Sequence, residues 1–200
     1  MSILFQFKRC FMRVGQGWGF PVRFAITRSL EVLFLWLLFG VGVDAASVES
    51  VDGGIVYRDS EGQTVQLTDP NNDEDPVLSP DGTRVAFIRF NGIPEKEEGY
   101  GINCSIWIVD ISGKNLRHLI SGQDSTDMEK VLVDFHGILF SPDGSELFFH
   151  SSTWATSSAI HAIKLDTGEH RYICPGELKR IVPRGEYANH LLVEMHRYFL

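Results

Sequence analysis

The chain has 200 residues, 44% of them hydrophobic, and its 18 basic and 26 acidic residues give a formal net charge of −8. A chain of this length and composition can bury a core, and a single domain is the default expectation. Its acidic character argues against nucleic acid as a partner, because negative side chains repel the phosphate backbone.

The first 45 residues have the composition of an export signal. Met1–Arg28 carries five basic residues and no acidic one, and an apolar run of 12 residues follows at Val32–Val43, before small residues that end at Ala45. This order is typical of a secretory signal peptide, with cleavage predicted after Ala45. The run is shorter than the ~20 residues that span a bilayer. We therefore predict a signal-peptide helix and an exported protein, periplasmic or extracellular; the alternatives are an uncleaved N-terminal membrane anchor and a buried helix of the folded domain.

Cleavage of this segment makes the protein more acidic. Residues 1–45 hold five basic and two acidic residues, so residues 46–200 keep 13 basic and 24 acidic residues, a net charge of −11. A surface of this charge favours partners with basic patches, or cations.

A four-residue turn occurs twice in the remaining chain. The two copies consist of the residues Ser79, Pro80, Asp81, Gly82 and Ser141, Pro142, Asp143, Gly144. Proline presets φ for the second position of a type I turn, aspartate tolerates the third position, and glycine supplies the positive φ that follows. Strand-like sequence flanks both copies, so each copy predicts a β-hairpin inside a repeated unit.

The sequence around each turn predicts four antiparallel strands per unit. Two full units cover residues 75–120 and 136–176, with aspartates of the turns 62 positions apart. Half-units are predicted at residues 53–69 and 178–200. The acidic stretch Glu95–Glu98 lies in an insertion of the first unit, where we expect a solvated loop.

The segments "LTDPNNDEDPVLSPDGTRVAF", "ILFSPDGSELFF" and "IKLDTGEH" resemble the WD40-like repeat of TolB-type β-propellers. This resemblance implies an all-β fold for residues 46–200, a partial β-propeller of about three four-stranded antiparallel blades. Propellers close with about 4–8 blades. We therefore expect a truncated relative of a longer propeller, or a chain whose exposed blade edges pair with a second copy.

The loop before the first turn is a candidate calcium site. Oxygen-bearing side chains stand at alternate positions, namely Asp69, Asn71, Asp73 and Asp75. This is the spacing that begins a calcium-binding loop, although Glu74 occupies the position where such loops have glycine. The alternative is a solvated loop between blades.

Cys104 and Cys174 are the cysteines that remain after cleavage. They could form a disulfide in an oxidising compartment, or they could be two small buried side chains. The seven histidines are scattered, at positions His118, His136, His150, His161, His170, His190 and His196. None has the spacing of a zinc motif, so we expect surface or core histidines.

The sequence contains no catalytic motif, because it has neither a Gly-x-Ser-x-Gly elbow nor a glycine-rich phosphate loop. We expect no cofactor. The family resemblance implies a non-catalytic scaffold that binds a protein partner in the cell envelope, in the periplasm. The alternative is the propeller part of a peptidase whose hydrolase domain is missing from this chain.

Overall fold

The computed structural model describes residues 45–92, 101–154 and 157–195. These residues form thirteen strands in four antiparallel sheets and no helix, so the predicted all-β fold is confirmed. The predicted signal-peptide helix lies outside the described residues. Nothing in the described part of the chain forms a helix with the length and apolar character needed to cross a membrane.

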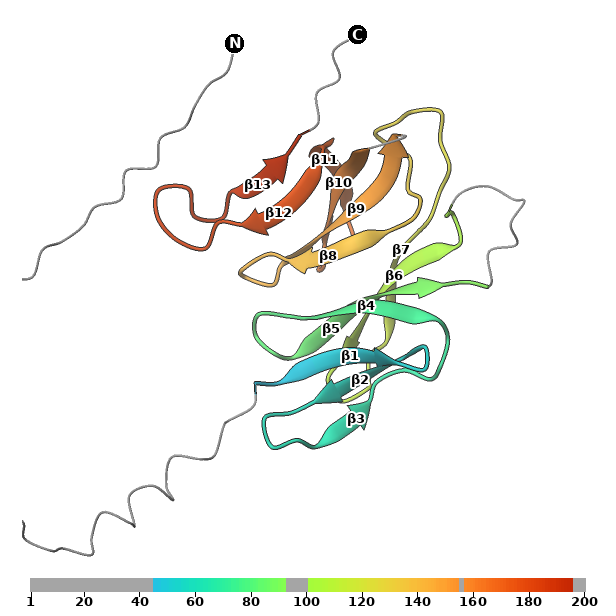
Figure 1. Ribbon diagram of the computed structural model, residues 1–200, viewed down its shortest axis with the longest axis vertical. Helices are drawn as coiled ribbons and strands as arrows, with labels where there is room; N and C mark the ends of the chain where they lie inside the picture. Colours follow the sequence, from blue (N-terminus) through green and yellow to red (C-terminus); the bar gives the residue numbers. More distant parts are fainter. Residues whose placement is uncertain (1–44, 93–100, 155–156, 196–200) are drawn as a thin grey trace, which may run out of the picture. The chain divides into compact units, whose positions relative to one another are not determined.

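Two of the four sheets have four strands each (Figure 1). The strands of the first sheet are β4 (Asp73–Leu78), β5 (Arg84–Phe90), β6 (Cys104–Asp110) and β7 (Arg117–Ser121). The strands of the second sheet are β8 (His136–Phe140), β9 (Glu146–Trp154), β10 (Ser157–Lys164) and β11 (His170–Pro175). Both sheets are meanders, in which each strand is hydrogen-bonded to its neighbours in the chain.

The other five strands form two smaller sheets. A three-stranded sheet contains β1 (Ser47–Val51), β2 (Gly54–Arg58) and β3 (Thr64–Gln66), and a two-stranded sheet contains β12 (Glu177–Ile181) and β13 (Leu191–Glu194). The sequence predicted two strands in the half-unit that begins at residue 53, and the structure adds β1 in front of them. Of the described sheets, two rather than three have the predicted four strands.

The two repeated turns have the same geometry. Gly82 and Gly144 both have φ of +69°, the left-handed conformation that the sequence predicted for them. In each turn the serine hydroxyl donates a hydrogen bond of 2.6 Å to the aspartate, from Ser79 to Asp81 and from Ser141 to Asp143. The repeat therefore preserves side-chain contacts as well as backbone conformation.

A β-bulge also recurs in both four-stranded sheets. The register of β4 against β5 shifts after Glu74, which lies opposite Ile88. The register of β8 against β9 shifts after His136, which lies opposite His150. Glu74 and His136 are separated by the same 62 positions as the two turns, so the bulge belongs to the repeated unit. A bulge changes the direction of the side chains next to it.

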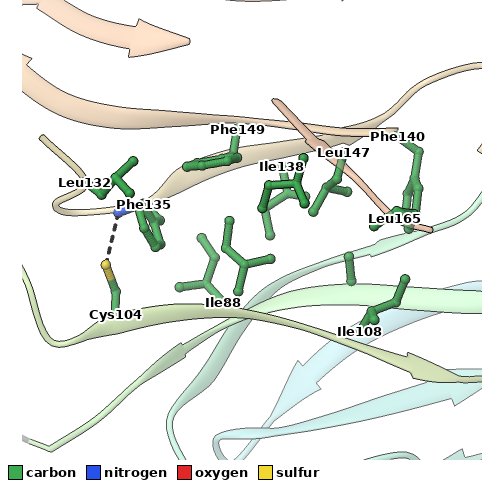
Figure 2. Packing of buried hydrophobic residues seen from close by; sticks show 13 residues of the cluster. Ile88, Cys104, Ile108, Leu132, Phe135, Ile138, Phe140, Leu147, Phe149 and Leu165 are labelled. Atoms are coloured by element: carbon green, nitrogen blue, oxygen red, sulfur yellow. Dashed lines mark hydrogen bonds between the residues drawn. The ribbon is translucent and has the colours of Figure 1, made fainter. Parts of the chain in front are cut away.

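The larger hydrophobic core lies between the two four-stranded sheets. Figure 2 shows Ile88 and Ile108 of the first sheet facing Ile138, Leu147 and Phe149 of the second. Full burial of such a side chain stabilises the fold by ~1.5–3 kcal/mol. The two sheets are therefore held together mainly by apolar contact.

A smaller core covers the opposite face of the first four-stranded sheet. Ile55 of β2 and Leu67, which directly follows β3, pack with Val85 and Phe87 of β5. The first sheet is thus covered on both faces, as the apolar residues at successive positions of β5 predict.

Candidate functional site

A cluster of polar side chains forms where the bulged end of the second four-stranded sheet meets β12. His136 begins β8, His150 lies opposite it in β9, and Glu177 is the first residue of β12. One ligand atom from each of these three residues lies within 4.8 Å of those of the other two. We refer to His136, His150 and Glu177 as the His–His–Glu cluster.

Two backbone features bring these side chains together. The bulge places His136 opposite His150, and the two rings stack with centroids 5.0 Å apart and an interplanar angle of 15°. Gly176 connects β11 to β12 with φ of +126°, and a Cβ atom there would lie 2.6 Å from the carbonyl oxygen of Glu194. A residue without a side chain is therefore required immediately before Glu177.

The hydrogen bonds of His136 define which of its nitrogens carries the proton. Nδ1 lies 2.9 Å from the backbone carbonyl oxygen of Asp134. A carbonyl oxygen can only accept, so Nδ1 donates, and in the neutral ring Nε2 carries the lone pair. The hydroxyl of Ser158 lies 3.3 Å from that Nε2 atom.

His150 is the most deeply buried member of the cluster, with 5% of its surface exposed. Its Nε2 atom accepts a hydrogen bond of 2.7 Å from the backbone N–H of Leu178 and lies 3.6 Å from Glu177 Oε2. Its Nδ1 atom is buried without a hydrogen-bond partner. Burial, followed by the nearby His136, lowers the pKa of His150, so the ring is neutral at pH 7.

Gly137 makes room for the His150 ring. A Cβ atom at position 137 would lie 2.6 Å from His150 Nδ1, and Gly137 has φ of +60°. Both the space and the backbone conformation favour glycine at this position. The bulge glycine is therefore part of the structure that positions His150.

The cluster presents two imidazole nitrogens and a carboxylate to one small region, a donor set suited to a cation. The Ser158–His136 contact also resembles a nucleophile and its base. Ser158, however, is only 6% exposed, whereas a nucleophile must reach its substrate. The arrangement is thus better suited to binding than to acyl transfer.

The four residues of the predicted calcium site have different environments. Asp73 is fully buried, and its carboxylate accepts hydrogen bonds from Arg89 and Thr68. Asp69, Asn71 and Asp75 are exposed. The carboxylates of the three aspartates do not form a ligand group within the described part of the chain, and the calcium site stays a prediction.

Cys104 and Cys174 are both free thiols in the structure. Cys104 is buried in β6 and donates to the carbonyl oxygen of Gly101 at 3.0 Å, while Cys174 lies in β11 of the other four-stranded sheet. Burial raises the pKa of each thiol. Both side chains thus have the environment of small apolar residues.

The aspartates of the repeated turns are bound within the turns themselves. Asp81 accepts from the hydroxyls of Ser79 and Thr83, and these hydrogen bonds lower its pKa to about 2. Hydrogen bonds from Ser141 and Ser145 lower the pKa of Asp143 to about 2. The turn motif therefore serves the fold.

Sequence reasoning missed the His–His–Glu cluster. Phe140 pairs with Leu147 next to the second turn. If the strands β8 and β9 paired regularly from there, His136 would lie opposite Ser151. The bulge moves His150 into that position instead. Gly137 directly after His136 was the available signal, because an isolated glycine in a strand indicates a bulge.

No protein-family model matches the chain, and no curated protein matches it. Similar solved structures include TolB from Acinetobacter baumannii, with 20% identity, a TM-score of 0.42, and coverage of 64% of this chain and 28% of that one. The β-propeller domain of the trilobed protease from Pyrococcus furiosus has 15% identity and a TM-score of 0.40, and the match covers 65% of this chain and 37% of that one. Oligogalacturonate lyase from Vibrio parahaemolyticus has 19% identity and a TM-score of 0.41, and the match covers 62% of this chain and 31% of that one.

Solved structures similar to this chain thus include TolB and the β-propeller domain of a protease. The chain spans about a third of the length of these three neighbours, between 28% and 37%.

Proposed function

We propose that this chain is an exported propeller-type module that binds a protein partner in the cell envelope and performs no catalysis itself. The observation that supports this function is the exposure of three large apolar side chains in and next to the β12–β13 hairpin. Tyr187, Leu192 and Met195 are 61%, 47% and 56% exposed, the highest values among the large hydrophobic residues that the structure describes. We call these three residues the hairpin patch.

Large exposed apolar side chains in one hairpin favour a protein partner over a small ligand. Large apolar side chains in contact with water mark interaction surfaces, and tyrosine is enriched where binding energy is concentrated. The net charge of −11 in residues 46–200 favours a partner that surrounds its own apolar patch with basic side chains. An enzyme would instead need an accessible nucleophile or base beside a substrate cleft.

The proposal is tested with a matched pair of surface variants in the full chain. Leu192→Lys places a charge in the hairpin patch, whereas Leu116→Lys changes a residue of similar exposure (44%) in the turn between β6 and β7. Each protein is cross-linked in envelope extracts of its source cells, and the cross-linked proteins are compared by mass spectrometry.

We expect one stoichiometric partner with the wild type and with Leu116→Lys, and its loss with Leu192→Lys. The same cross-linked proteins from all three chains would contradict the proposal. A cross-linked second copy of the chain, lost in the same variant, would show that the hairpin patch serves self-association. Hydrolysis of peptide substrates by the purified wild-type chain would favour the peptidase alternative.

A further inference from the structure

We propose that the His–His–Glu cluster binds one divalent transition-metal ion, with zinc preferred, and that this ion links the β8–β9 hairpin to β12. The site goes beyond the proposed binding of a protein partner and does not depend on it. Its three ligands are Nε2 of His136, Nε2 of His150 and a carboxylate oxygen of Glu177.

The spacing of the ligand atoms suits a small ion. One ligand atom from each of the three residues lies within 4.8 Å of those of the other two, and His150 Nε2 is 3.6 Å from Glu177 Oε2. Ligands that bind zinc at about 2.1 Å in a tetrahedron are about 3.4 Å apart. The His150–Glu177 edge of such a tetrahedron is therefore nearly formed already.

The tautomer of His136 also fits a metal ligand. Its Nδ1–H donates to the carbonyl oxygen of Asp134 at 2.9 Å, which leaves the Nε2 lone pair available. Histidines that bind metals usually donate their other ring N–H to a carbonyl or carboxylate in this way. The Ser158 hydroxyl, 3.3 Å from Nε2, can rotate away, because a hydroxyl is not fixed in direction.

His150 carries its lone pair on the correct nitrogen as well. Its Nε2 atom accepts from the backbone N–H of Leu178 at 2.7 Å, so an ion has to compete with one neutral hydrogen bond. A bond between zinc and imidazole is much stronger than such a hydrogen bond. His150 is also almost fully buried, so the surrounding protein holds its ring in place.

Glu177 supplies the negative charge of the site. Lys179, two residues away in the chain, pairs with Glu194 at 2.7 Å. His136 and Glu177 are only half-buried, so an ion can enter from solvent. Three protein ligands with access to water leave a fourth position for water or another ligand, as in zinc sites that contain two histidines and one glutamate.

Two imidazoles and one carboxylate favour zinc over hard cations. Imidazole suits zinc, copper, nickel and iron, whereas magnesium and calcium prefer sites made of oxygen. The site is thus chemically distinct from the predicted calcium loop around Asp73.

The experiment uses the full chain, purified with a tag that contains no histidine, stripped with a chelator and titrated with zinc by calorimetry. Glu177→Gln removes the charge but keeps the shape, and His136→Gln removes a nitrogen ligand. His118→Gln is the matched control, because His118 is an exposed histidine in β7 that contacts Ser121 and Trp107. X-ray absorption of the zinc-loaded protein reports the ligand atoms directly.

We expect one zinc ion per chain, an affinity at least tenfold weaker in Glu177→Gln and His136→Gln, and no change in His118→Gln. The absorption spectrum should show nitrogen and oxygen ligands at about 2.0–2.2 Å and no sulfur. Equal zinc affinities in Glu177→Gln and His118→Gln, or no zinc binding by the wild type, would overturn the proposal. If His136→Gln does not fold, the partly exposed Glu177→Gln decides the result.

Discussion

Arg89 binds Asp73 through two parallel hydrogen bonds in the interior of the protein. Nε lies 2.6 Å from Oδ1 and Nη2 lies 2.8 Å from Oδ2, and the hydroxyl of Thr68 donates to Oδ2 at 2.6 Å. The guanidinium also lies over the rings of Phe87 and Trp107, at 5.4 and 4.9 Å from their centroids. This ion pair connects β4 to β5. It lies beyond the β4 bulge, at the end of the hairpin opposite the turn of Ser79 to Gly82.

We expect Asp73→Ala to lower the free energy of unfolding by about 3–5 kcal/mol, because it leaves the Arg89 charge buried without its partner. The matched control is Glu49→Ala, which breaks an exposed pair with Arg58 whose atoms are 3.5 Å apart. Such a surface pair contributes about 0–1 kcal/mol. Urea denaturation followed by circular dichroism measures both values, and equal losses would contradict the assigned role of Asp73.

The conformation of Gly82 gives a second prediction. A Cβ atom at this position would meet no atom within 4 Å, so any cost of a side chain comes from φ of +69° alone. We expect Gly82→Ala to lower the free energy of unfolding by about 1–2 kcal/mol. Gly82→Asn should lose less, since asparagine tolerates the left-handed region better. A loss for asparagine as large as for alanine would show that φ is not the cause.

A pair of histidines in the second four-stranded sheet predicts a dependence of stability on pH. His161 is fully buried, and its Nδ1 atom lies 3.0 Å from His170 Nε2. Burial, with a smaller effect of His170, lowers the pKa of His161 to about 4, and burial also lowers the pKa of His170. The folded protein therefore resists protonation of both rings.

In the unfolded chain both histidines take up protons below about pH 6.5. In the folded chain His161 does so only near pH 4, and the pKa of His170 is also below its usual value. The free energy of unfolding should therefore be greatest above pH 6.5 and fall by about 2–3 kcal/mol as the pH decreases to 4. Urea midpoints between pH 7.5 and pH 4 measure this change. His161→Leu should flatten the dependence, and the exposed His190→Gln should not; equal slopes in all three proteins would contradict the prediction.

The environments of the two free thiols predict their reactivity. We expect Cys104 to be unreactive and Cys174 to react slowly with iodoacetamide in the folded protein, because burial raises both pKa values and thiolate is the reactive form. Both should react rapidly in denaturant without a reducing agent. Mass spectrometry of the labelled peptides distinguishes them from Cys10. A peptide that joins Cys104 to Cys174 would establish the disulfide instead.

Features that depend on neighbouring residues could be predicted from the sequence. The turn of Ser79 to Gly82 follows from four adjacent residues, and the alternation of Val85 and Phe87 with Ala86 and Ile88 correctly indicates a strand covered on both faces. The all-β class follows from the same local patterns.

The candidate site could not be predicted in this way, because its parts come from three strands. Glu177 and His150 are 27 positions apart in the chain. They lie close together only because the chain passes from β11 into β12 and brings Glu177 back to β9. The spacing of ligands along the sequence carries no signal for such a site. The same reason applies to Asp73, whose alternate spacing predicted a calcium ligand, while its position opposite Arg89 depends on the bulge in β4.

The same bulge occurs at equivalent positions of the β4–β5 and β8–β9 hairpins, so the same backbone conformation can present different side chains. One backbone geometry presents Glu74 and Ile88 in the first unit and His136 and His150 in the second. Exchange of one pair for the other also requires glycine at the position of Gly137, which Asp75 occupies in the first unit, because a Cβ atom there would lie 2.6 Å from His150 Nδ1. A protein assembled from such units can diversify one hairpin at a time while the others maintain the fold.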